Sequence, residues 1–397
     1  MVWLKNQQLK QWSIEISRHL SHLSLSQLRG LATWSFGMVM TKSSSVTRIS
    51  KFMAQLNDET PNTVRTRLKE WYQDSEAKKG THRLELKVNT CFAPLLKWIL
   101  SLWPRDCNYL PLAIDTTNIR DELIVLSVNV LIGGSGVPVA WKVVRATEKG
   151  SWQPFWKELL QSLKDVIPDN FLTIVCADRG LYADWLYEQI QECGWHPMLR
   201  INHHQGTFRL HPNSSWRNLS ELISHAGACW SGKVTCFKTN PIDCTLLGCW
   251  QPEDKGPWLI ITDLDPDSVD ILWYHLRYQI ECNYRDIKSD AWQWHHTRLS
   301  DPLRAERIWL AIAVATLWTL SVGGSADNES HKNKASQTHH HYSSNSVKKN
   351  PVRHLSCFLL GLLTIVADFL NGKPVVLPPL YPEPWPTSYP QTIPNTS

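Results

Sequence analysis

Tyr274-His-Leu-Arg277-Tyr-Gln-Ile-Glu281-Cys-Asn-Tyr-Arg285-Asp-Ile-Lys288 is the stretch of sequence that decides the fold. Glu281 has Arg277 four residues before it, Arg285 four residues after it and Lys288 seven after it. An α-helix carries residues at these offsets along one side, and Tyr274 joins the same stripe.

The ordinary interpretation of such a stripe is a solvated helix with ion pairs between successive turns. Tyr278, Ile280 and Ile287, however, supply the apolar positions that a packed helix needs. We therefore expect the apolar side to face a core and the charged stripe to face an anion such as DNA phosphate.

Two short apolar runs elsewhere in the chain end in aspartate. Residues 110–114 lead to Asp115, and residues 171–177 lead to Asp178. Buried strands are typically continuous apolar runs, and sites in α/β sheets gather at the carboxyl ends of strands. Either aspartate alone is more typical of a turn or a helix cap. With Glu281 they form an all-oxygen set, which suits Mg²⁺ or Mn²⁺ better than zinc.

These three blocks resemble the insertion-sequence-4-type DDE transposases, whose best-known member is the transposon-five transposase. The family's tyrosine–arginine–glutamate–lysine motif matches Tyr274, Arg277, Glu281 and Lys288 in spacing. Asp115-Thr-Thr-Asn resembles the first aspartate block, and Asp178-Arg-Gly-Leu-Tyr resembles the second. The resemblance covers about residues 105–315.

The order of predicted elements favours an α/β fold with a ribonuclease-H-like catalytic core, interrupted by a β-rich insertion and preceded by an all-α N-terminal DNA-binding region. Two β-rich runs flank a Gly-rich turn at 133–136, and helices at 152–163 and 182–193 alternate with strands. The expected units are a helical DNA-binding domain (1–104), the core (105–203 and 265–320), the insertion (204–264), a flexible linker (321–350) and a C-terminal helix with a Pro-rich tail (351–397).

The resemblance implies a mechanism for the core. Asp115, Asp178 and Glu281 would hold two Mg²⁺ ions, which Mn²⁺ can replace, roughly 3.5–4 Å apart. Water would attack the phosphodiester at the end of a mobile element, and the freed 3′-OH would attack the opposite strand or target DNA. The expected phosphate contacts come from Tyr274, Arg277, Arg285 and Lys288.

The resemblance also implies a tryptophan that receives a base flipped out of the DNA, and the matching residue is Trp258. A flipped base needs an aromatic face to replace its lost stacking. The chain holds 21 Trp, so any one of them is more often part of the core, and Trp250 is the alternative.

The N-terminal hundred residues predict helices at about 8–20, 26–39, 45–56 and 63–72. Arg65, Arg67 and Lys69 are expected on one basic face of the last helix. The last two helices then form a helix-turn-helix pair that reads double-stranded DNA at the terminal inverted repeats. An ordinary helical bundle with a solvated basic face explains the same residues equally well.

The two ends of the chain and its overall composition are less informative about function than the three acidic blocks. Residues 354–370 predict an apolar helix too short and interrupted for a membrane span, and by the resemblance it mediates a homodimer in the synaptic complex. Ten cysteines without a Cys-x-x-Cys pair, and no signal peptide at the N-terminus, favour free thiols in a prokaryotic cytoplasm, with the protein at the nucleoid. The net charge of +5 favours a polyanionic partner only mildly.

Three functions remain open at this point. The first is an active cut-and-paste transposase of an insertion sequence. The second is a domesticated relative that acts as a metal-dependent nuclease and cuts without joining. The third is an inactive relative that acts as a DNA-binding inhibitor, which the intact Asp115, Asp178 and Glu281 disfavour.

Overall fold

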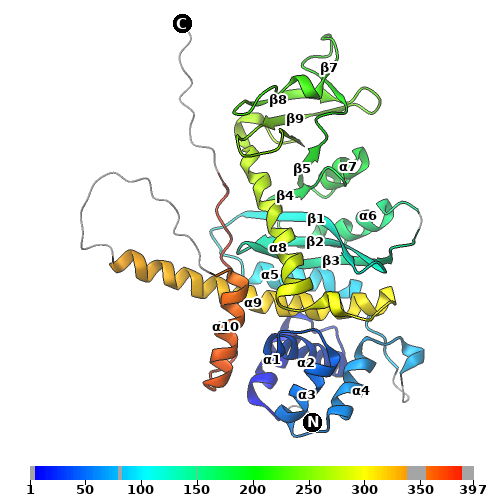
Figure 1. The fold of residues 1–397 in the computed structure, drawn as a ribbon, viewed down its shortest axis with the longest axis vertical. Helices are drawn as coiled ribbons and strands as arrows, with labels where there is room; N and C mark the ends of the chain where they lie inside the picture. Colours follow the sequence, from blue (N-terminus) through cyan, green and yellow to red (C-terminus); the bar gives the residue numbers. More distant parts are fainter. Residues whose placement is uncertain (1–4, 79–82, 149, 338–354, 387–397) are drawn as a thin grey trace.

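The computed structural model describes residues 5–78, 83–148, 150–337 and 355–386. The protein is a mixed α/β structure built around one ten-stranded sheet. The N-terminal helices gather at one end of the molecule, and the long helix α9 (Pro302–Gln337) runs between them and the sheet (Figure 1).

The chain begins with helices whose starts are fixed by side-chain caps. Ser24 forms a capping box with Gln27, while Ser45 and Thr60 accept hydrogen bonds from amides of their own first turns. The predicted helices are present with shifted ends, and α5 is an addition that packs on α1 and β3. The bounds are α1 (Gln7–His19), α2 (Leu25–Thr41), α3 (Val46–Asn57), α4 (Pro61–Tyr72) and α5 (Phe92–Ser101).

The first five strands follow the order β3-β2-β1-β4-β5. The pairs β1–β2 and β2–β3 are antiparallel, whereas β1–β4 and β4–β5 are parallel. Gly133 and Gly134 both have positive φ, which lets a tight turn join β2 to β3. The strands are β1 (Tyr109–Ile119), β2 (Leu123–Ile132), β3 (Ser135–Arg145), β4 (Leu172–Ala177) and β5 (His196–Ile201).

Helices cover both faces of these strands. Strand β1 shows the division, because Leu112 and Ile114 pack in the cluster that contains Trp156 of α6 (Gln153–Gln161). Ala113, between them, packs in the cluster that contains Ile280 of α8 (Tyr278–Arg285). Helix α7 (Asp184–Glu192) packs on β5 and α6. Both faces of the strands are buried, which explains their continuous apolar sequences.

The β-rich segment after β5 continues the same sheet. Strand β10 pairs antiparallel with β5 and with β9, so the sheet runs without a break from β5 to β7. Cys229 and Cys249 are paired across β8 and β9 and form a disulfide, so the prediction of free thiols is wrong for these two. The strands are β6 (Thr207–Arg209), β7 (Arg217–Asn218), β8 (Cys229–Cys236), β9 (Ile242–Cys249) and β10 (Trp258–Thr262).

The predicted flexible linker at 321–350 is wrong at its start, because α9 continues as a helix to Gln337. Gly323 is a packing residue rather than a break. A Cβ at Gly323 would lie 1.8 Å from the carbonyl oxygen of Cys357 in α10 (Cys357–Leu370), and a Cβ at Gly361 would lie 1.9 Å from that of Thr319. The two glycines let the helix backbones touch, which a polar composition alone does not reveal. The rest of the predicted linker, from 338, falls on residues outside the described part up to 354.

Among the described helices, residues Pro302–Ser330 of α9 are long and apolar enough to cross a membrane. Of the most apolar window, 89% is buried inside the protein. That burial is typical of a core helix, and α9 indeed contacts α2, α10 and β3.

Candidate active site

The sheet brings Asp115 and Asp178 to one place. Asp115 lies in β1 and Asp178 follows the last residue of β4, and the parallel register aligns Ile114 with Ala177. Side chains alternate along a strand, so Asp115 and Asp178 share the face of Ala113 and Cys176. Those two residues pack in the same cluster as Ile280, and both aspartates therefore face the helix that carries Glu281.

Buried polar contacts fix α8 against this face. The hydroxyl of Tyr284 donates to the carbonyl oxygen of Asp115 at 3.0 Å. The amide of Asn283 donates to Oδ1 of Asn129 in β2, also at 3.0 Å. Because these bonds lie within the next turn after Glu281, they set the rotation of the helix and hold the glutamate beside the two aspartates.

A single guanidinium joins the three carboxylates. Arg277 Nη2 lies 2.8 Å from Asp115 Oδ2 and 3.8 Å from Asp178 Oδ2, and Nη1 lies 2.7 Å from Glu281 Oε1. The sequence places Arg277 four residues before Glu281, so the last contact is the expected pairing of successive turns. The contacts with the two aspartates are tertiary, and no spacing in the sequence predicts them.

The site has a buried floor and an open rim. The side chains of Arg277 and Asp115 are 11% and 18% exposed, whereas those of Asp178 and Glu281 are 38% and 51% exposed. Burial raises the pKa of Asp115, and the Arg277 charge opposes that rise. Burial pulls the pKa of Arg277 down, but Tyr274, Asp115, Glu281 and Asp178 together hold it above its ordinary value. The site is therefore open to solvent on the side of Asp178 and Glu281.

The donor set fits a divalent cation. Three carboxylates from three separate elements already converge on one positive group, and oxygen-only sets suit Mg²⁺ and Mn²⁺. As placed, no three acidic, histidine or cysteine side chains in the described residues are close enough to hold a metal ion by themselves. The Arg277 guanidinium stands between the carboxylates, so a metal would compete with it.

Comparison with known families agrees with this geometry. Residues 126–318 match the family model described as the transposase DDE domain. This segment of the chain is therefore similar to a transposase DDE domain. The match supports an enzyme that cleaves DNA and transfers DNA strands. Asp178 and Glu281 lie inside the matched residues, and Asp115 lies eleven residues before their first residue.

Among solved structures, the chain is similar to a chain in the cryo-EM structure of the piggyBac transposase synaptic complex with hairpin DNA. The TM-score is 0.39 at 12% sequence identity, over 94% of this chain and 80% of that chain. No curated protein matches the sequence.

Within the matched segment, the side chain of Tyr274 lies in a different place from the one expected. Its side chain is buried, and its hydroxyl donates to the carbonyl oxygen of Ala177 at 3.0 Å. Burial also raises the pKa of the phenol, so it stays protonated as a donor. In this structure the Tyr274 hydroxyl is therefore bonded to the protein backbone, and its phosphate contact stays a prediction. The residue instead ties the Arg277 segment to the end of β4, next to Asp178.

The predicted stripe does not lie on one α-helix. Residues Ile271–Arg277 form a 3₁₀-helix (η6), α8 follows, and Asp286–Asp290 form a π-helical turn (η7). Lys288 is half-buried, where burial lowers the pKa of its ammonium and the Asp115 charge opposes that shift, so it lies on the carboxylate side. Arg285 is exposed and pairs with Asp290 at 3.4 Å.

Trp258, the expected base acceptor, starts β10 and is partly buried beside the active site. Its ring lies 5.1 Å from the Arg200 guanidinium, 4.6 Å from the His275 ring and 5.5 Å from the Tyr274 ring. These neighbours already contact the indole, so a base would need one of them to move. Trp250 instead donates its Nε1 hydrogen to the Asp254 carbonyl at 3.0 Å. The base-acceptor role stays a prediction.

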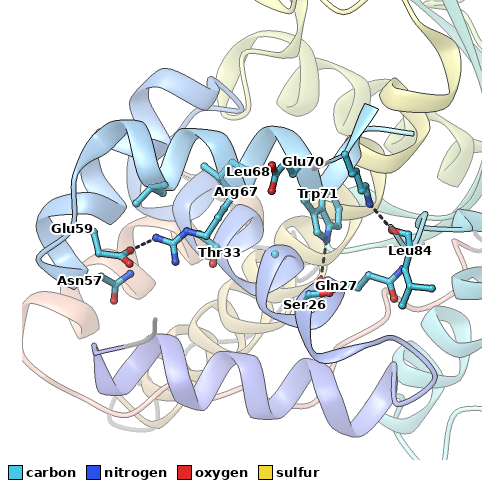
Figure 2. A pocket seen from close by; sticks show the side chains of 13 residues that line it. Ser26, Gln27, Thr33, Asn57, Glu59, Arg67, Leu68, Glu70, Trp71 and Leu84 are labelled. Atoms are coloured by element: carbon cyan, nitrogen blue, oxygen red, sulfur yellow. Dashed lines mark hydrogen bonds and ion pairs between the residues drawn. The ribbon is translucent and has the colours of Figure 1, made fainter. Parts of the chain in front are cut away.

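The three basic residues predicted to share one face of helix α4 lie on two different sides of it. Arg65 is exposed and Lys69 lies one turn further along the same side, whereas Arg67 points the other way and pairs with Glu59 (Figure 2). A helix turns about 100° per residue, so residues two apart face nearly opposite directions. The prediction that Arg67 shares the face of Arg65 and Lys69 is therefore wrong. The pocket of Figure 2 is closed further by Trp71, whose Nε1 donates to the Gln27 carbonyl.

Three residues that support the site were not predicted from the sequence: Asn283, Tyr284 and Asp286. Tyr284 and Asn283 hold α8 in register, as described above. Asp286, buried at 7% exposure, accepts a hydrogen bond from the Ser135 hydroxyl at 3.0 Å, and burial raises its pKa to about 6. One signal was available, because Tyr284 and Ile287 continue the apolar spacing of Ile280 at four and seven residues.

Proposed function

We propose that this protein is the transposase of an insertion sequence, which cuts DNA at terminal inverted repeats in a divalent-metal-dependent reaction and then joins the freed end to target DNA. The observation that carries the proposal is the convergence of Asp115, Asp178 and Glu281 on one cation. The three carboxylates come from β1, from the residue after β4 and from α8, and the open rim beside them suits a phosphodiester.

The residues divide the chemistry between them. Asp115, Asp178 and Glu281 would hold the metal ions. Bound Mg²⁺ or Mn²⁺ supplies charge stabilisation for the attacking and leaving oxygens of the phosphodiester. Hydrolysis of the end would leave a 3′-OH on one fragment and a 5′-phosphate on the other, and the 3′-OH is the nucleophile for joining.

Arg277 has two functions in this proposal. Without metal it neutralises the carboxylates and keeps them together. If a metal takes over part of this pairing, the planar fork of Arg277 would be available to hold a phosphate next to the cut. Lys288, half-buried on the same side, adds a point charge to the phosphate grip.

A ribonuclease-H-like core is part of the proposal. Its support is the strand order β3-β2-β1-β4-β5, with three antiparallel strands, two parallel ones, and carboxylates on β1, after β4 and on a later helix. The insertion-sequence-4 type is proposed on the spacing of Tyr274, Arg277, Glu281 and Lys288. Cytoplasmic action on the nucleoid and a homodimeric synaptic complex belong to the same proposal.

The test incubates the purified full chain with a duplex that carries the DNA flanking its gene, in Mg²⁺. Wild type is compared with Glu281→Gln, which keeps the size of the side chain and removes its charge. We expect the wild type to release a 3′-OH end and to join it to a target plasmid. Glu281→Gln should cut at least about a thousandfold more slowly.

Two outcomes would change the proposal. Equal cutting by wild type and Glu281→Gln would remove Glu281 from the active site. Cutting by the wild type without any joining would replace the transposase by a metal-dependent nuclease with the same active site.

A further inference from the structure

A second cavity lies between the N-terminal helices and the loop that follows the active-site helix. We name it the α3–α4 groove, and its volume is about 540 Å³. One wall is the start of α3 with parts of α2 and α4, and the other is the loop 293–299. The residues that matter for the ligand are Ser44, Arg48 and Arg65 on the first wall and Gln293, His296 and Arg298 on the second.

The charges in the α3–α4 groove have one sign. Arg48, Arg65 and Arg298 line it together with His296, and all four are exposed. No aspartate or glutamate is among the lining residues in the described part of the chain. The α3 N-terminus also opens here, and its amides add positive potential to the same wall.

Neighbouring arginines are neutralised within the fold. Arg304 and Arg307 pair with Asp74, at 2.9 and 2.8 Å. Within the described residues, by contrast, Arg65 and Arg298 form no ion pair, and Arg48 donates to the neutral amide oxygen of Gln293. The positive charge of the groove is thus left for an external anion.

Hydrogen bonds fix the two walls of the groove. The amide of Ser44 donates to the Trp292 carbonyl at 2.7 Å, and Arg48 Nη1 reaches Gln293 Oε1 at 2.9 Å. On the far side of the loop, Arg120 donates to the Thr297 carbonyl at 3.0 Å. The two walls and Arg48 therefore keep their places without a ligand, which lowers the ordering cost of binding.

The distance between the active site and the groove suggests that the anion bound in the groove is a phosphate of the same DNA duplex. Residues 281–290 are continuously helical, and about 1.5 Å per residue puts residue 290 about 13 Å from Glu281, while the groove lining begins three residues further on, at Gln293. Along duplex DNA, with about 3.4 Å per step on each strand, that is about four base pairs. Phosphates at that distance from the cut can reach the groove while the scissile phosphate is at Asp115, Asp178 and Glu281.

We propose that the α3–α4 groove binds the phosphate backbone of the DNA duplex about four base pairs from the position of cutting. Arg65 comes from the N-terminal helices and Arg298 from the segment that follows the active-site helix. The groove thus sets the spacing between the DNA held by the N-terminal helices and the bond that is cut. This assignment rests on the proposed function for its ligand.

The test measures DNA affinity without metal, so that it does not depend on cutting. A fluorescein-labelled duplex carrying the flanking DNA is titrated with the full chain over a range of salt concentrations. The variants are Arg65→Ala with Arg298→Ala, and the charge-preserving pair Arg65→Lys with Arg298→Lys. Arg105→Ala, an exposed arginine ahead of β1 and outside the groove, is the matched control.

We expect the alanine pair to weaken binding and to reduce the slope of log affinity against log salt by about 0.9 for each phosphate contact removed. The lysine pair should recover most of the slope, and Arg105→Ala should match wild type. Ethylation of phosphates about four base pairs from the cut should interfere with wild-type binding and not with binding by the alanine pair.

The groove assignment would be overturned if the alanine pair kept the wild-type slope of log affinity against log salt. It would also be overturned if ethylation of the same phosphates still interfered with binding by the alanine pair. An alanine pair that has lost the circular dichroism of the wild type while the lysine pair binds normally would still support it, because charge is then the shared requirement. If ethylation of these phosphates interferes with binding but the protein never cuts DNA, the groove assignment is supported and the proposed function is contradicted.

Discussion

The two ends of the segment 271–299 present arginines to opposite environments. At the first end, Arg277 is 11% exposed and contacts three carboxylates. At the other end, Arg298 is exposed in a groove lined by no acidic side chain among the described residues. The same residue type is therefore a structural counterion at one end and an anion-binding group at the other. Only the neighbours brought by the fold distinguish them.

The largest effect should come from removing the counterion. Arg277→Met keeps the apolar stem and leaves the buried Asp115 beside two other carboxylates. Loss of one partner of a buried pair costs about 3–5 kcal/mol in the free energy of unfolding at neutral pH. Urea unfolding measures it, with Arg105→Met as the control at an exposed arginine.

Acid should reverse that loss. Burial already raises the pKa of Asp115, and removal of Arg277 would raise it further. A raised pKa means that stability is present at low pH and lost as the pH rises through the folded-state value. The deficit of Arg277→Met should therefore shrink in acid. A deficit that is equal at all pH values would indicate lost packing instead of lost charge.

A smaller effect is expected at Asp286, midway between the two ends. Burial raises the pKa of Asp286 from 3.8 to about 6, and the Asp290 charge adds to the rise. The Ser135 hydrogen bond and the Arg285 charge lower the pKa but do not offset the burial. The wild type should lose about 3 kcal/mol or less of unfolding free energy as the pH rises through this window. Asp286→Asn, which still accepts from Ser135, should lack that loss. The difference in urea midpoints between about pH 4 and pH 8 measures it, and identical pH profiles would contradict the burial of a charge there.

The smallest effect is expected at Arg285, which lies between the two ends and pairs with Asp290 on the surface. Arg285→Ala should change the free energy of unfolding by less than about 0.5 kcal/mol, because exposed pairs contribute little. If Arg285 touches DNA, the salt slope of binding falls by about 0.9. A large loss of stability would show that Arg285 belongs with Arg277 and not with Arg298.

The acidic end could be predicted from the sequence because its signals are local. Asp115 and Asp178 each follow an apolar run that predicts a buried strand. The two strands, β1 and β4, pair in parallel, which brings the two aspartates together. The buried role of Tyr274 could not be predicted, because its partner is a carbonyl 97 residues away in the chain. A spacing shows which residues share a helix face, but not which of them the rest of the fold covers.

The basic groove and the long helix α9 were missed for a related reason. Arg48 and Arg298 are 250 residues apart in the sequence and meet only because the loop 293–299 packs on α3. In α9, glycine and serine predicted a linker, yet Gly323 allows α10 to approach its backbone. Glycine and serine are common both in flexible linkers and where two helices pack closely. Their composition alone therefore does not tell the two cases apart, and the position of the second helix decides.

The central claim is that Arg277 and a divalent cation compete for Asp115, Asp178 and Glu281. Calorimetric titration of the full chain with Mn²⁺, in wild type, Arg277→Met and Glu281→Gln, tests it most directly. We predict at least about tenfold tighter binding in Arg277→Met, because the competing charge is gone, and weaker binding in Glu281→Gln. Equal Mn²⁺ affinity in all three proteins would contradict the claim.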